Sequence, residues 1–91
     1  MNPNPAGYYL PLPESLEKEI ENLIRGDLRC LMADVAHYLA NESDQFIGSR
    51  CSPEFDDFVT PLKEEGLIQL IKYLAERLLW LNSQDKPHAQ S

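Results

Sequence analysis

Residues 62–81 are the most apolar part of the chain and have the periodicity of a helix. With successive residues about 100° apart around the axis, the apolar side chains occupy roughly 260° of the circumference. The polar positions form one narrow strip, which consists of Glu65, Gln69, Lys72 and Glu76. An ordinary surface helix has an apolar stripe of about 100°. The pattern therefore predicts a helix with neighbours on two or three sides, which is a large demand for a chain of 91 residues.

A second apolar pattern runs through residues 14–40. Its large apolar members are Leu16, Ile20, Ile24, Leu28, Leu31, Val35 and Leu39. Their mean spacing of about 3.8 exceeds the 3.6 of a straight helix, so the stripe drifts by roughly 80° along the segment. Gly26 and Asp27 are the expected joint, because glycine weakens a helix interior and aspartate can cap a new helix. We expect one long helix kinked at this joint, in preference to two separate helices.

The segment between these two patterns predicts a loop and a short helix. Residues 41–52 are polar, and their only large apolar pair, Phe46 and Ile47, is expected to anchor the loop on the core. Ser52 followed by Pro53 is typical of a helix cap and a first-turn proline. Together with the spacing of the apolar residues that follow, this signal predicts a short helix over residues 53–59.

The fold class expected from these elements is all-α. Thr60 followed by Pro61 repeats the cap signal, so the last helix is expected to begin there and to end near Asn82. The result is a long helical hairpin with a short connecting helix, and no alternating strand pattern competes with it. Two such hairpins would complete a four-helix bundle as a homodimer, which would give the apolar helix its missing neighbours.

The two ends of the chain are expected to lie outside the helical domain of residues 14–82. The proline-rich residues 1–13 predict an extended arm whose apolar end lies over a helix, with a disordered leader as the alternative. The polar residues 83–91 predict a disordered tail. The chain has neither a signal peptide pattern nor an apolar run long enough to span a membrane. We therefore expect a cytoplasmic protein with reduced thiols.

Charge narrows the class of partner. The chain has 15 acidic and 8 basic residues and a formal net charge of −7, which argues against direct binding to nucleic acid or to an anionic membrane. Acidic residues concentrate in residues 42–57. The candidate acidic surface consists of Glu42, Asp44, Glu54, Asp56 and Asp57. It suits a basic protein, although a solvated acidic face is the ordinary interpretation.

Candidate metal and catalytic residues are few. Cys30, Asp34 and His37 share one side of a helix, and with Cys51 they allow a zinc site to be drawn. Structural zinc sites have paired ligands at both ends, and Cys51 has no such neighbour, so we predict no metal and no cofactor. A Cys30–Cys51 disulfide would close a loop of about 20 residues, but cytosolic redox conditions disfavour it. Cys30 and His37 are about 10 Å apart along a helix, too far for a nucleophile and its base, so we predict no catalytic residues.

These patterns favour a small non-enzymatic protein-interaction module, such as a regulator, adaptor or assembly factor. It would use its apolar helix for dimerisation or to bind another protein. The predicted interface consists of Leu67, Leu70, Tyr73, Leu74, Leu78, Trp80 and Leu81. The alternative is an acidic inhibitor that occupies a basic, nucleic-acid-binding site on another protein.

Overall fold

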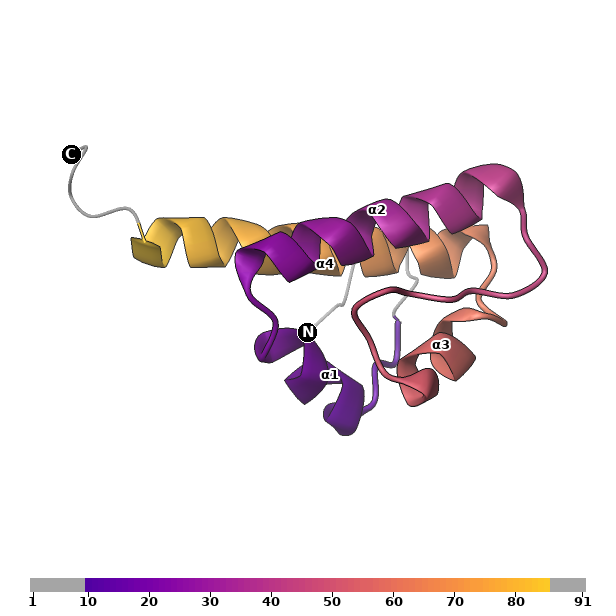
Figure 1. Cartoon of the computed structure of the whole chain (residues 1–91), viewed down its shortest axis with the longest axis horizontal. Helices are drawn as coiled ribbons and strands as arrows, with labels where there is room; N and C mark the ends of the chain where they lie inside the picture. Colours follow the sequence, from indigo (N-terminus) through magenta and orange to yellow (C-terminus); the bar gives the residue numbers. More distant parts are fainter. Residues whose placement is uncertain (1–9, 86–91) are drawn as a thin grey trace.

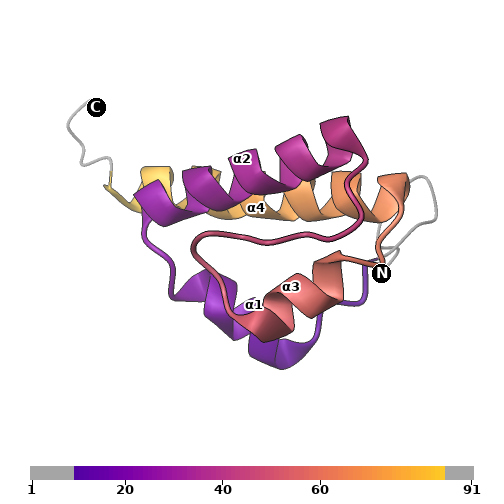
Figure 2. The same cartoon turned by 45° about the vertical axis from the view of Figure 1, so that its right-hand side comes forward.

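The computed structural model describes residues 10–85, and these form helices without strands. The helices are α1 (Glu14–Glu21), α2 (Arg25–Asn41), α3 (Pro53–Val59) and α4 (Glu64–Asp85). α2 and α4 lie side by side and antiparallel in one layer, and α1 and α3 form a second layer against them (Figure 1, Figure 2). The all-α prediction is confirmed, and the hairpin is the α2–α4 pair.

The segment predicted as one kinked helix is two separate helices, so that prediction is wrong. α1 ends at Glu21, and Ile24 has an extended backbone (φ −82°, ψ 170°) before α2 begins. Gly26 and Asp27, the expected joint, lie in the first turn of α2 instead. The break absorbs the drift of the apolar stripe, because each helix can then turn its own buried residues to the common core. Ile24 lies at the break and is 67% exposed.

The loop after α2 is anchored by one residue of the predicted pair. Phe46 is 2% exposed, whereas Ile47 is 72% exposed. The ring of Phe46 meets the ring of Tyr38 edge to face, with centroids 5.6 Å apart. The backbone N–H of Phe46 also donates a 3.1 Å hydrogen bond to Oγ1 of Thr60. The loop is therefore tied both to α2 and to the end of α3.

α3 has the predicted limits, whereas α4 does not. The N–H of Phe55 donates a 3.2 Å hydrogen bond to Oγ of Ser52, which caps α3 ahead of Pro53. Thr60 ends α3 rather than beginning α4, because its hydroxyl donates to the carbonyl of Asp56 at 2.9 Å. α4 begins at Glu64 and continues to Asp85, past the expected end, so residues 83–85 belong to the helix and not to the tail.

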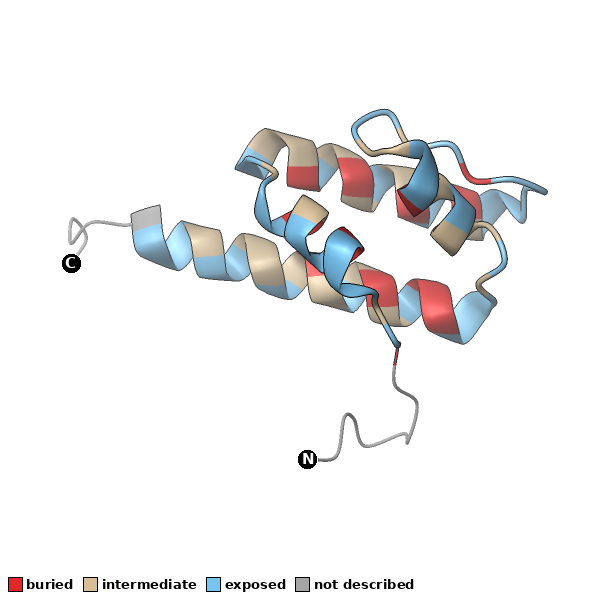
Figure 3. Ribbon diagram, turned by 90° about the horizontal axis from the view of Figure 1, so that it is seen from below, coloured by how far each residue is buried: buried red, intermediate tan, exposed pale blue. Residues whose placement is uncertain are grey.

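The core lies between the two layers. It is formed by Leu10, Leu16, Ile20, Leu28, Leu31, Val35, Tyr38, Phe46, Phe55, Val59, Leu67, Leu70 and Leu74. In α4 the buried residues lie in the N-terminal half, and the C-terminal half carries only partly buried and exposed ones (Figure 3). Most of the neighbours that the apolar helix needs are thus supplied by the chain itself. Of the predicted polar strip, Gln69 is partly buried and the other members are exposed.

The predicted arm enters the described structure only at its apolar end. Leu10 is buried in the core and Leu12 packs against it, as expected for this end of the arm. The rest of the arm, residues 1–9, and residues 86–91 of the predicted tail lie outside the described residues. None of the helices in residues 10–85 is long and apolar enough to cross a membrane.

Candidate protein-interaction surface

Three of the predicted interface residues are part of the core. Leu67, Leu70 and Leu74 are 4%, 0% and 0% exposed. They hold α4 against the rest of the chain and present no surface to a partner, so they are removed from the predicted interface. The reason is that these residues form the arc of α4 that faces the core, and this arc could not be identified from the helix pattern alone.

The other predicted interface residues surround this arc. Tyr73, Leu78 and Leu81 are partly buried and pack against the core. Trp80 is 50% exposed, and the guanidinium carbon of Arg77 lies 4.5 Å from its ring centroid. This distance is typical of a cation–π contact.

One edge of α4 is occupied by α1. Burial raises the pKa of the Tyr73 phenol, and the nearby carboxylates of Glu17 and Glu21 in α1 raise it further. Nη2 of Arg77 donates a 3.1 Å hydrogen bond to the backbone carbonyl of Glu21. Tyr73 and Arg77 each precede a core-facing leucine of α4 by one position.

A second apolar stripe follows the core stripe on both long helices. In α2 the core-facing residues are Leu28, Leu31, Val35 and Tyr38, and each is followed by one of Arg29, Met32, Ala36 and Leu39. In α4 the corresponding residues are Leu67, Leu70, Leu74 and Leu78, and each is followed by one of Ile68, Ile71, Ala75 and Leu79. One position is about 100° around a helix, so each second stripe lies beside its core stripe.

The two second stripes lie on the same side of the α2–α4 layer. The core stripes of α2 and α4 face a common core. Viewed from one end, one helix winds clockwise and its antiparallel neighbour counterclockwise. A step of one residue from each core stripe therefore leads to the same side of the α2–α4 layer. The opposite step leads to the second layer: Arg77 reaches α1, and Asp34 accepts two 3.0 Å hydrogen bonds from Ser49 in the loop. We call the side away from α1, α3 and the loop the outer face (Figure 2). The one-residue step assigns the residues of the two second stripes to this face.

The outer face is largely apolar and open to solvent. Ile68 is 46% exposed and Leu79 is 66% exposed. Ala36 is also exposed, and the remaining apolar members are partly buried. Within residues 10–85, the second layer and the loop all lie on the other side of the α2–α4 layer (Figure 2).

Charged residues lie at the rim of the outer face. Nη1 of Arg25 donates a 3.3 Å hydrogen bond to Oδ1 of Asn82, which places the start of α2 beside the end of α4. Arg29 is four residues inward from Arg25 and Glu76 is six residues inward from Asn82, so their levels along the helices differ by about 3 Å. Both side chains are exposed, and they have opposite charges on opposite rims.

The candidate acidic surface is partly used inside the fold. Oδ1 of Asp56 accepts hydrogen bonds from the N–H of Gly48 at 3.0 Å and from Sγ of Cys51 at 3.3 Å. Oε2 of Glu54 accepts one from Oγ of Ser15 at 3.3 Å. Asp56 therefore holds the loop against α3, while Glu42, Asp44, Glu54 and Asp57 are exposed. The acidic-inhibitor hypothesis stays a prediction.

The four residues considered for a zinc site in the sequence do not form one in the structure. Asp34 is engaged with Ser49, Cys51 donates to Asp56, and Cys30 and Cys51 are both free thiols. In the part of the chain that the structure describes, no three His, Cys, Asp or Glu side chains are grouped so as to hold a metal ion. Burial raises the pKa of the Cys51 thiol to about 12, and the hydrogen bond and negative charge of Asp56 add to this effect.

Sequence reasoning missed the outer face. Met32, Ala36 and Ile68 were not among the predicted interface residues, although a signal was present. Both long helices carry apolar residues directly after their core-facing ones, which widens the apolar arc on one side.

Compared with protein-family models, curated protein sequences and solved structures, the chain matches none.

Proposed function

We propose that this chain is a small non-enzymatic interaction module that pairs with a second copy of itself through the outer face. The observation that carries the proposal is the apolar stripe beside the core stripe on both α2 and α4, which helix geometry places on the side of the layer away from α1 and α3. Two copies that meet through this face form a four-helix bundle of two α2–α4 pairs, with α1 and α3 on the outside of each.

The size of the face suits a weak, specific dimer. With 17 residues, α2 is about 25 Å long, and two packed helices are about 20 Å wide, so the face covers on the order of 500 Å². Pairing of two copies then buries about 1,000 Å² in total, which is near the lower limit for a specific interface. We therefore expect a dimer whose population depends on protein concentration.

The charges at the rim favour one arrangement of the two copies. A twofold axis parallel to the helices places α2 of one copy over α4 of the other and preserves the level of each residue along the axis. Arg29 then lies opposite the partner's Glu76, and the same pair forms a second time by symmetry. The alternative axis, perpendicular to the helices, would place Arg29 over α2 of the other copy, which has no acidic member in its outer stripe.

Solution mass measured by sedimentation equilibrium over a range of concentrations tests the pairing. The mass should rise towards about 21 kDa, twice the 10.4 kDa chain. Ile68→Glu should prevent this rise, because it places a charge in the apolar interface. Ile47→Glu is the matched control, because Ile47 is 72% exposed in the loop and lies outside the outer face. If Ile68→Glu and the unaltered chain associate equally, the proposed interface is wrong.

A charge exchange tests the orientation separately. Arg29→Glu and Glu76→Arg should each weaken association, because each places like charges opposite one another at two equivalent points. The double variant restores opposite charges and should associate nearly as well as the unaltered chain. A double variant that associates no better than the single variants would mean that the axis is not parallel to the helices.

A further inference from the structure

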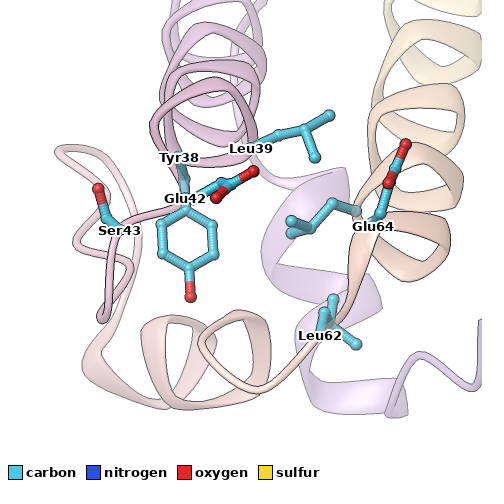
Figure 4. Close-up of a pocket in the computed structure, with 7 residues that line it drawn as sticks. Tyr38, Leu39, Glu42, Ser43, Leu62 and Glu64 are labelled. Atoms are coloured by element: carbon cyan, nitrogen blue, oxygen red, sulfur yellow. The ribbon is translucent and has the colours of Figure 1, made fainter.

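A pocket opens where the end of α2 meets the beginning of α4 (Figure 4). Its volume of about 490 Å³ lies within the range of pockets that bind small ligands. Leu39, Leu62 and Leu67 provide apolar walls. The hydroxyl of Tyr38 also lies in the wall, but it donates a 2.7 Å hydrogen bond to the carbonyl of Thr60 and is fixed by it. The pocket thus combines three leucine side chains with a polar lining of Tyr38, Glu42, Ser43 and Glu64.

Two carboxylates stand at the mouth of this pocket. Glu42 follows the last turn of α2 and Glu64 is the first residue of α4 (Figure 4). Neither side-chain carboxylate forms a hydrogen bond or ion pair with another residue in the range 10–85. The C-terminal end of α2 adds a partial negative charge of about half an electron. The last turn of α2 contains no basic residue to offset it.

We propose that this pocket binds a lysine or arginine side chain of a partner protein. The aliphatic stem would lie on Leu39, Leu62 and Leu67, and the cationic head between Glu42 and Glu64, which matches the way such side chains divide apolar and charged contacts. A bare divalent cation fits the site less well, because it needs about six oxygen ligands. The residues from 10 to 85 offer no group of three metal-binding side chains.

This binding site goes beyond the proposed dimer and does not depend on it. The pocket lies at the end of the α2–α4 layer, and only Leu39 also belongs to the outer face. The two proposals are also tested by different measurements. Pairing is measured as the solution mass of the protein, and the pocket is tested by the affinity of the protein for a cationic side chain. Either proposal can fail while the other holds.

Two peptides that differ in one side chain test the chemistry. Seven-residue peptides of glycine and serine with a central lysine or a central norleucine are titrated into the isotope-labelled full chain, and amide shifts are followed by NMR. The lysine peptide should shift the signals of Ser43 and Leu67 at the pocket, with a Kd on the order of 1 mM for a single side chain. The norleucine peptide has the same stem without the charge and should bind at least about fivefold more weakly. Equal binding of both peptides would overturn the proposal.

Three variants locate the charge. Glu64→Gln should raise the Kd of the lysine peptide about fivefold. Glu42→Gly should do the same, and it also removes a side chain from a left-handed backbone position, so loss of binding cannot be ascribed to a poorer fold. Glu65→Gln is the matched control, because Glu65 is in the same turn of α4 but does not line the pocket. If all three variants weaken binding equally, the peptide senses only the net charge of the chain and the assigned site is wrong.

Discussion

Arg77 of α4 caps the C-terminal end of α1, because its Nη2 donates a 3.1 Å hydrogen bond to the backbone carbonyl of Glu21. The last carbonyls of a helix have no partner within the helix. In α1 the carbonyls of Lys18, Glu19 and Ile20 accept from the two residues after the helix, and the next carbonyl is that of Glu21. The last helix thus completes the hydrogen bonding at the break between the first two.

Replacing Arg77 by methionine should destabilise the fold. The change keeps the apolar stem and removes the donors, so the free energy of unfolding should fall by about 1 kcal/mol. Urea unfolding measures the loss, and the emission of Trp80 should change at the same time because the guanidinium lies 4.5 Å from the centroid of its ring. Lys63→Met, at an exposed position, should stay within about 0.5 kcal/mol of the unaltered chain. Equal stabilities of the two variants would contradict the capping role.

Two glycine-to-alanine changes should have opposite signs. At Gly48 an added Cβ would overlap Sγ of Cys51 and lie 3.1 Å from two ring carbons of Phe46, so Gly48→Ala should cost about 1–3 kcal/mol. At Gly26 nothing lies within 4 Å, and alanine is the better helix former, so Gly26→Ala should stabilise by about 0.5–1 kcal/mol.

Thermal unfolding of both glycine variants provides the measurement. Removing the overlapping sulfur should recover part of the loss, so Gly48→Ala combined with Cys51→Ala should be more stable than expected from the sum of the two single changes. A Gly48→Ala variant as stable as the unaltered chain would show that the loop yields freely at this point.

Local sequence patterns predicted a helix start correctly where no distant group competed with the helix for the capping oxygen. Ser52 and Pro53 predict the start of α3 because cap and first-turn proline act within one turn. Thr60 and Pro61 carry the same signal, yet the hydroxyl of Thr60 serves the end of α3 and the loop instead. The break before α2 was likewise beyond a local pattern, because the carbonyl that it exposes is satisfied by Arg77, 56 positions away.

The helix pattern of α4 could not identify which of its apolar residues enter the core. The wide apolar arc of the last helix predicted neighbours on two or three sides; in the structure part of the arc is buried in the core, and Leu79 is 66% exposed. Which part of that arc enters the core depends on where α1 and α2 lie around it, and no spacing within α4 carries this information. Leu70 and Ile68 are both apolar members of the arc, but Leu70 is fully buried and Ile68 is 46% exposed.

Replacing Glu42 by glycine should stabilise the fold. Among residues 10–85, Glu42 is the single non-glycine residue with a positive φ, at 49°, and it ends α2 in the left-handed conformation. Glycine adopts this conformation without the cost of a Cβ, so the variant should gain about 1 kcal/mol. Glu42→Ala is the control, because it removes the carboxylate but keeps the Cβ, and it should gain much less. Equal gains in urea unfolding would assign the effect to charge rather than to the backbone.

The thiol of Cys51 should make the fold less stable at high pH. Its pKa is about 12 in the folded chain and 9.0 for an ordinary thiol, so the folded state holds the proton more tightly. The stabilisation is complete below about pH 9 and is lost as the pH rises from there towards 12. Tyr73 acts in the same direction, since its pKa is also raised. Cys51→Ser keeps a hydrogen-bond donor for Asp56 without an ionisable thiol, so urea unfolding between about pH 8 and 10 should show a smaller loss for this variant than for the unaltered chain. Identical pH profiles would mean that the environment of Cys51 does not suppress its ionisation.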